Sequence, residues 1–137
     1  FAGLALILTT LIRASAYGAL FSHPAVGFFA VLGGGALSRL AMAALWAALP
    51  NARPDGLAAR LGRPDTYALA LAAGLALLLS SPLAALGGAP AILAGLAAFA
   101  FGALARAKIG GQTGDILGAT QVLAEAAFLV GLLLFGR

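Results

Sequence analysis

The 137-residue chain has no cysteine, a single histidine and very little charge. The absence of cysteine excludes disulfides, cysteine-based zinc sites and a cysteine nucleophile. One histidine, His23, cannot build a histidine-based metal site, so any bound metal would be a hard ion held by carboxylates. Charged residues make up only 9% of the chain and hydrophobic residues 63%, which is not the composition of a soluble globular protein.

Long apolar segments fill the chain instead. The mean hydropathy is +1.08, and apolar runs near the roughly 20 residues needed to cross a bilayer recur along the sequence. Proline and glycine divide these runs into expected helices at residues 1–20, 25–49, 66–79 (or as far as 86), 89–105 and 115–135. We predict an all-α, polytopic bundle of about five membrane-spanning helices, forming a single transmembrane domain over residues 1–137. Because the chain opens inside an apolar run, we expect a fragment whose N-terminal part is missing.

The net charge of +4 resides mainly in two connecting segments. Five alternating crossings place the polar loop at 51–65 and the loop at 106–114 on the same side, where they carry Arg53, Arg60, Arg63, Arg106 and Lys108. The opposite turns hold only His23. By the positive-inside rule the basic side faces the cytoplasm. No Lys/Arg-rich run with interleaved aromatic residues is present, so we do not expect nucleic acid as a partner.

Glycine, a hydroxyl and a carboxylate concentrate in the segment Gly110–Asp115, directly before the last apolar helix. Glycine lets the backbone approach a ligand closely, and a helix N-terminus presents free N–H groups suited to phosphate. Thr113 is placed to cap the helix or to contact a substrate oxygen, and Asp115 falls in the first turn. The segment therefore predicts a phosphate-contacting site or, equally, a well-formed turn and cap.

A stripe of small and polar residues follows along the last helix, comprising Gly114, Gly118, Gln121 and Glu125. At about 100° per residue these positions share one face, which we expect to pack closely against a neighbouring helix. Glu125 and Arg39 each lie roughly 16 Å from the same end of their helices. Since a charge at this depth usually has a partner, we hypothesise an intramembrane Arg39–Glu125 pair. Separate partners for the two are the alternative, and we expect Arg13 to extend to the lipid headgroups.

The Gly-rich segment and its surroundings resemble a known family. The pattern Gly110-Gly111-x-Thr113-Gly114-Asp115-x-Leu117-Gly118-Ala119, followed by Glu125 and an apolar tail, resembles the C-terminal signature of cobalamin synthase, adenosylcobinamide-GDP ribazoletransferase. Residues 38–42, leading to Pro50 and a basic loop, are similar to the middle of that family. The resemblance extends over most of the chain in order and spacing, while the family's acidic upstream signature is absent.

The resemblance implies a multi-pass enzyme of the bacterial or archaeal inner membrane, with its active face in the cytoplasm. It would join adenosylcobinamide-GDP to α-ribazole or its 5′-phosphate, release GMP and depend on Mg²⁺. The site residues expected on this basis are Asp115 for catalysis or Mg²⁺ binding, and Lys108, Gly110, Gly111, Thr113 and Gly114 for substrate binding. The expected partners are these two substrates and the lipid bilayer, and a homo-oligomer or assembly with other late cobalamin-pathway enzymes stays open.

Two other classes of protein fit the same sequence. A transporter or channel would use Arg39 and Glu125 to line a translocation path. A structural membrane module would use the small-residue stripe only to pack helices, and would tolerate replacement of Asp115 by Asn or Ala.

Overall fold

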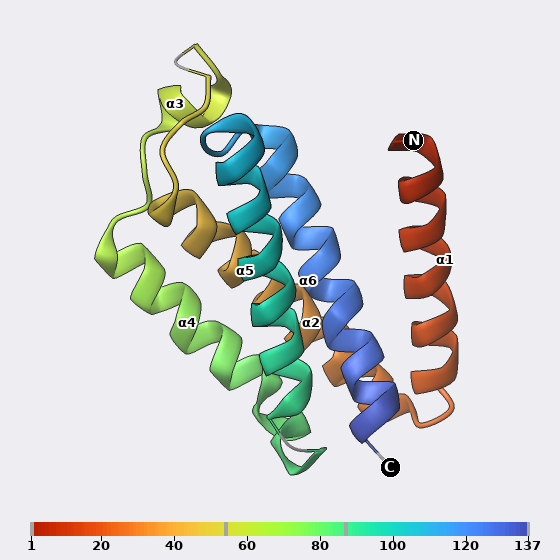
Figure 1. The fold of residues 1–137 in the computed structure, drawn as a ribbon. Helices are drawn as coiled ribbons and strands as arrows, with labels where there is room; N and C mark the ends of the chain where they lie inside the picture. The colour runs from red at the N-terminus through yellow and green to blue at the C-terminus, as the bar shows by residue number, and fades with distance from the viewer. Residues whose placement is uncertain (1, 54, 87, 137) are drawn as a thin grey trace.

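Five long helices run up and down in a single bundle (Figure 1). The computed structural model describes residues 2–53, 55–86 and 88–136. The long helices are α1 (Ala2–Leu20), α2 (Pro24–Ala48), α4 (Thr66–Ser80), α5 (Ala89–Ile109) and α6 (Gly114–Phe135). The short helix α3 (Leu57–Leu61) lies in the connection between α2 and α4, and a 3₁₀ turn, η1 (Ser81–Leu86), follows α4.

Local sequence signals fix the ends of these helices. Proline in the first turn begins both α2 and α5, where its missing N–H is not needed. The Asp65 side chain caps α4 by accepting a hydrogen bond of 2.6 Å from the Ala68 N–H. Gly110 ends α5 in the left-handed conformation, with φ of 83°, which glycine adopts without steric cost.

Glycines bring the helices into close contact. A Cβ at Gly33 of α2 would lie 3.1 Å from the Cα of Ser80 on α4, and one at Gly131 of α6 would lie 2.7 Å from the Cα of Pro90 on α5. In lipid no hydrophobic force drives helices together, so such close packing is a main source of association. The bundle is thus held by α2, α5 and α6 at its centre, with α4 and α1 outside them (Figure 1).

The predicted all-α bundle is confirmed. Four of the helices, α2, α4 with its continuation to Ala84, α5 and α6, are long and apolar enough to cross a membrane, and residues Ile7–Leu20 of α1 form a shorter apolar helix. Two boundaries differ from the prediction. Helix α5 continues to Ile109, so Lys108 lies in its last turn and not in a loop, and the loop predicted over 51–65 contains α3.

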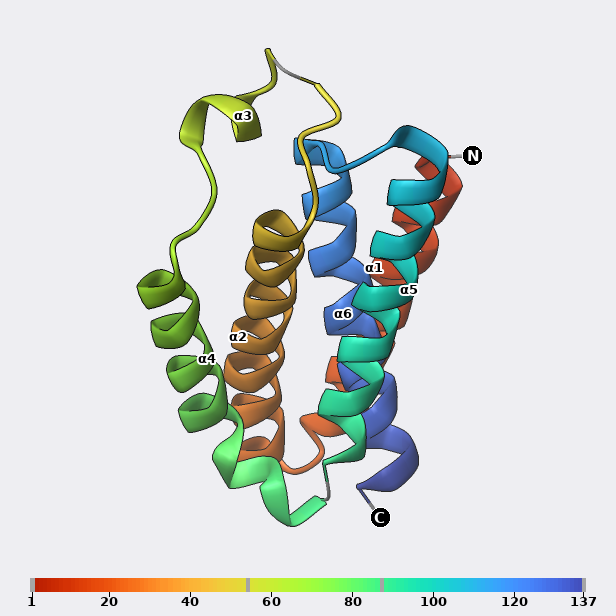
Figure 2. The same ribbon diagram turned by 60° about the vertical axis from the view of Figure 1, so that its left-hand side comes forward.

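The connections from α2 to α4 and from α5 to α6 lie at the same end of the bundle, as predicted (Figures 1 and 2). The turn from α1 to α2 and the connection from α4 to α5 lie at the opposite end. The basic residues of the two loop regions therefore share one end of the molecule.

Candidate functional site

The Gly-rich loop is attached to the chain segment that leaves α2. Asn51 and Gln112 form an isolated parallel β-bridge, in which the Gln112 N–H donates to the Pro50 carbonyl at 2.8 Å and the Ala52 N–H donates to the Gln112 carbonyl at 2.9 Å. The Gln112 side-chain amide also donates to Asn51 Oδ1. Two loops that are 61 residues apart in sequence are thereby fixed side by side.

Gly111 makes this attachment possible. It is buried, and a Cβ on it would overlap the Pro50 carbonyl oxygen. Gly110 and Gly111 therefore have structural reasons to be glycine, one for its left-handed backbone and one for its close approach. These structural reasons agree with the interpretation of the segment as a turn. Whether the segment also contacts phosphate stays a prediction.

Helix α6 begins at this loop with its capping residue in place. Thr113 has extended backbone geometry, and its hydroxyl accepts a long hydrogen bond of 3.4 Å from the Ile116 N–H. Gly114 and Asp115 form the exposed first turn, and in the part of the chain that the structure describes no protein acceptor is recorded for their backbone N–H groups. Such N–H groups and the positive end of the helix dipole favour an anion.

A polar cavity of about 160 Å³ lies between the two loops and the start of α6. Its lining includes the hydrogen-bonded side chains of Asn51 and Gln112, the first turn of α6 and one cationic side chain. These lining residues are Asn51, Arg53, Gly56, Ala58, Gln112, Thr113, Gly114 and Asp115. Of the residues predicted for the site, the cavity brings together Thr113, Gly114 and Asp115, while Gly110, Gly111 and the exposed Lys108 lie outside its lining.

Sequence reasoning missed three polar residues of this cavity. Asn51 and Arg53 belong to the polar loop at 51–65, in which the sequence predicts no site residue, and Gln112 lies inside the Gly-rich segment but is not among the site residues expected there. Gln112 is 1% exposed and its Oε1 has no hydrogen-bond partner among the described residues. The available signal was the position of two polar side chains, Asn51 and Arg53, directly after the helix-ending Pro50.

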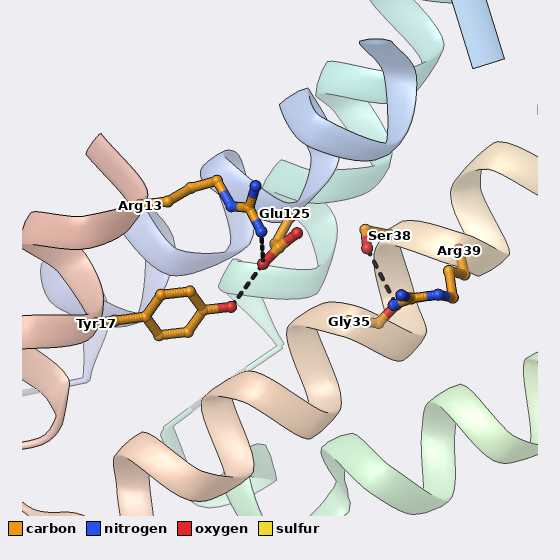
Figure 3. Close-up of polar contacts among 6 residues, drawn as sticks. All are labelled: Arg13, Tyr17, Gly35, Ser38, Arg39 and Glu125. Atoms are coloured by element: carbon orange, nitrogen blue, oxygen red, sulfur yellow. Dashed lines mark hydrogen bonds and ion pairs between the residues drawn. The ribbon is translucent and has the colours of Figure 1, made fainter. Parts of the chain in front are cut away.

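A second polar cluster lies inside the bundle, between α1 and α6 (Figure 3). Arg13 Nη2 donates to Glu125 Oε1 at 2.9 Å, and the Tyr17 hydroxyl donates to the same oxygen at 2.6 Å. The Glu125 side chain is 7% exposed and that of Arg13 is 37% exposed. The carboxylate is thus neutralised and bonded within the protein, as a charge at this depth requires.

The hypothesised Arg39–Glu125 pair is wrong. Arg39 Nη1 instead donates to the Gly35 carbonyl of its own helix at 2.9 Å, and in Figure 3 the two contacts of the Glu125 carboxylate come from Arg13 and Tyr17. Arg39 lies on the outer face of α2, in an apolar groove of about 670 Å³ toward α4. Arg39 and Glu125 lie at equal depth along their helices, but they do not face each other. The partner of Glu125 is Arg13, which was expected to extend to the headgroups. The transporter alternative loses the pair on which it rested.

The predicted packing stripe on α6 is also only partly correct. Glu125 is buried against α1, but Gly114 and Gly118 are exposed and have open space where a Cβ would lie. The helix contacts in this part of α6 involve its other faces, where Ile116, Leu117 and Thr120 are buried.

The described residues supply one carboxylate for a metal ion at the cavity. No group of three or more His, Cys, Asp or Glu side chains that could hold a metal occurs within the described ranges. Asp115 and Gln112 both line this cavity, and Mg²⁺ is commonly bound through one or two carboxylates together with substrate phosphates and water. The donor set therefore fits part of a magnesium site.

These features define a class of protein: a multi-pass helical membrane protein with a polar cavity where a Gly-rich loop meets the end of a transmembrane helix. The chain matches the family described as Cobalamin-5-phosphate synthase over residues 1–133. The chain belongs to this family.

Similar curated proteins carry the name Adenosylcobinamide-GDP ribazoletransferase. Those of Brucella ovis and Brucella canis are each 40% identical to this chain over 98% of its length, and that of Brucella melitensis is 39% identical over the same share. The chain spans 55% of the length of each of these relatives. No solved structure matches it.

Proposed function

We propose that the protein is a membrane-bound transferase that joins adenosylcobinamide-GDP to α-ribazole or α-ribazole 5′-phosphate, with release of GMP. The product would be adenosylcobalamin or its 5′-phosphate, late in cobalamin synthesis. The observation that carries the proposal is the placement of Gly110–Asp115 beside a polar cavity, in a chain 40% identical to the Adenosylcobinamide-GDP ribazoletransferase of Brucella ovis.

The reaction requires a hydroxyl of α-ribazole to attack the phosphorus that bears the corrinoid side arm. A new O–P bond forms, the bond from that phosphorus to the oxygen of GMP breaks, and GMP leaves with the electron pair while the hydroxyl loses its proton. Phosphorus transfer of this kind depends on positioning and charge neutralisation more than on a covalent nucleophile. A chain with no cysteine and one histidine is consistent with such chemistry.

The cavity residues divide between the two reacting groups. The first-turn N–H groups of Gly114 and Asp115, with the Arg53 guanidinium, suit the diphosphate, and Lys108 adds positive charge at the same end of the bundle. Thr113 offers a hydroxyl at the helix cap. The Asp115 carboxylate accepts a hydrogen bond from the attacking hydroxyl or serves as one ligand of Mg²⁺.

Magnesium dependence is part of the proposal. A bound Mg²⁺ would supply charge neutralisation at the diphosphate. Asp115 would provide one ligand, and the partial donor set at the cavity supports a metal shared with substrate phosphates.

The proposed location is the inner membrane, with the cavity on the cytoplasmic face. This orientation follows from the basic residues gathered at the cavity end of the bundle. Both proposed substrates are large, polar and anionic or nucleoside-like, so a cavity open to the cytoplasm is the arrangement that gives them access.

The test is GMP release by membranes that carry the full-length protein, with adenosylcobinamide-GDP and α-ribazole, in the presence and absence of Mg²⁺. We expect metal-dependent release that falls about 100-fold or more in Asp115→Asn, the scale of a lost acid–base or charge-stabilising group. Asp65→Asn is the matched control, because it makes the same chemical change at the same end and asparagine also caps helices well.

Normal release in Asp115→Asn would move the chemistry to other residues of the enzyme. Absence of release from well-folded wild-type protein would contradict the proposed transferase.

A further inference from the structure

Arg39 places a positive charge in the middle of a membrane-spanning helix. It lies roughly 14 Å from the cavity end of α2 and about 22 Å from the other end. Its Nη1 donates to the Gly35 carbonyl, one turn earlier in α2, which directs the guanidinium away from the cavity end and toward the middle of the helix (Figure 3). The guanidinium therefore does not extend to the headgroups at the nearer membrane surface, as arginine often does.

The surroundings of this guanidinium do not balance its charge. In the described part of the chain, the Gly35 carbonyl is its one recorded partner, and the recorded ion pair of the bundle involves Arg13 instead. Arg39 is exposed at the surface of the bundle, where it lines the groove of about 670 Å³ between α2 and α4. Charged residues at this depth face protein or a water-filled space and are paired, because leaving them in lipid is costly.

The shape and lining of the groove indicate a helix as its occupant. The lining on α2 extends from Val31 to Ala43, roughly 18 Å or about three helical turns. Small residues in it let another helix come close, and lining positions recur every three or four residues along both helices: Ala36, Arg39 and Ala43 on α2, and Ala72, Leu75 and Leu79 on α4. Apart from Arg39, the lining residues are apolar. Lipid chains would match the apolar lining but offer the guanidinium no acceptor, whereas a transmembrane helix with one carboxylate supplies both.

A second copy of this chain does not supply that carboxylate. The chain has four acidic residues, of which three lie at the cavity end of the bundle, far from the depth of Arg39. The fourth, Glu125, already accepts two hydrogen bonds between α1 and α6. A twofold pair through this groove would also bring two Arg39 side chains together. The chain spans 55% of the length of its relative from Brucella ovis, so a full-length protein of this family has further chain to place beside the bundle.

We propose that the groove between α2 and α4 holds a transmembrane helix of the full-length protein from outside residues 1–137, and that a carboxylate on this helix accepts hydrogen bonds from the Arg39 guanidinium. The contact is of the same kind as the one between Arg13 and Glu125, which joins α1 to α6. The inference concerns how the membrane domain is assembled, and it does not depend on the proposed transferase function.

The first test uses a probe at a residue that already lines the groove. Met42 is the single methionine of the 137 residues and belongs to the lining. Cells that express the full-length protein are grown with photo-methionine, a diazirine analogue of methionine, and their membranes are irradiated. Mass spectrometry then identifies what is joined to the peptide that contains residue 42. We expect an apolar peptide from outside residues 1–137, in a product that migrates as a single chain, and we expect this product to be absent from the control Met42→Leu.

The second test uses the sign of a change in stability. Arg39→Met in the full-length protein would leave the partner carboxylate buried without its cation, so we expect the thermal unfolding temperature in detergent to fall by about 5–10 °C. Arg39→Lys keeps a cation at this position and should lower the temperature less. Conversion of the carboxylate on the crosslinked helix to its amide should restore most of the loss in Arg39→Met. If Arg39 faced lipid, its replacement by methionine would leave the unfolding temperature unchanged or raise it.

Several results would overturn the inference. Lipid adducts alone at residue 42 would show that the groove faces the bilayer. A crosslink to residues 1–137 of another copy would make the groove a contact between copies, and a crosslink to a different protein would place the partner outside the full-length chain. An unchanged or higher unfolding temperature in Arg39→Met would contradict the ion pair. Because the wild-type crosslink needs neither turnover nor a variant that folds, these outcomes are independent of the GMP-release test.

Discussion

The two polar clusters of this protein lie in different surroundings and use their groups differently. Inside the bundle, Arg13 and Tyr17 both donate to one oxygen of Glu125, so the carboxylate is engaged within the protein. At the end of the bundle, Gln112 and Asn51 bond each other and join two loops, in a cavity that the exposed Asp115 also lines. One cluster joins α1 to α6, and the other joins the two loops at the cavity.

The difference follows from the solvent around each cluster. A carboxylate surrounded by helices and lipid has no water to bond, so it must find its partners within the protein. Residues at the loop end can exchange water for a ligand at lower cost. The intramembrane cluster therefore holds two helices together, while the cluster at the loop end holds two loops together beside a cavity.

The largest expected effect in stability comes from the attachment of the two loops. In Gly111→Ala the added methyl group would overlap the Pro50 carbonyl, forcing the loops apart and opening the cavity. We expect a loss of about 1–3 kcal/mol in the free energy of unfolding, as for other overpacked sites, together with loss of the proposed transferase activity. Unfolding in mixed micelles with increasing denaturing detergent measures the free energy of unfolding, and GMP release measures the activity.

Gly95→Ala is the control for this change. Gly95 lies in the middle of α5 with open space at its Cβ position, so we expect unchanged activity and equal or slightly greater stability. Equal losses of stability and activity in Gly111→Ala and Gly95→Ala would contradict a specific role for the Gly111–Pro50 contact.

A smaller effect is expected for the intramembrane cluster, and a double-mutant cycle isolates it. Arg13→Met, Glu125→Leu and the double variant should give a coupling energy between about 0.6 and 1.7 kcal/mol, the average and the maximum for hydrogen-bonded pairs in a membrane bundle. The parallel cycle of Arg39→Met with Glu125→Leu should give a coupling near zero, because Arg39 bonds Gly35. Coupling in the second cycle and none in the first would restore the pairing expected from depth alone.

The smallest effect is expected for Tyr17→Phe. It removes one hydrogen bond to Glu125 but leaves the Arg13 contact and the aromatic ring in place. We expect a loss of about 0.6 kcal/mol in stability and no change in KM for either proposed substrate. A changed KM for α-ribazole would mean that the intramembrane cluster and the cavity act together, and the contrast between them would need revision.

Much of the fold could be predicted because it depends on local properties of the chain. Apolar runs of bilayer length, interrupted by Pro24, Pro50 and the glycine pairs, gave the number and order of the helices. Boundaries were less accurate where no breaker occurs, as at the end of α5, which continues through Lys108 until Gly110 adopts a positive φ. The helix ends were thus predictable where a residue type forces them.

The candidate site could be predicted only in part. Thr113 and Asp115 were identifiable because a cap and a first-turn carboxylate have fixed positions relative to a helix start. Asn51 and Gln112 could not be identified from the sequence, because their pairing joins segments that are 61 residues apart. The partner of Glu125 was misassigned for the same reason: Arg13 and Arg39 both lie within reach in depth, and only the rotation of α1 and α2 about their axes distinguishes them.

The sequence by itself determined a helical membrane bundle, the shared end of its basic loops and the position of the Gly-rich segment before the last helix. These follow from hydropathy, helix breakers and alternation of crossings, which act over short stretches of chain. Only the tertiary structure decided that Arg13 neutralises Glu125, that Arg39 faces outward and that Gln112 and Asn51 line one cavity. Each of these depends on which faces of distant helices meet, and that is set by packing of the whole bundle.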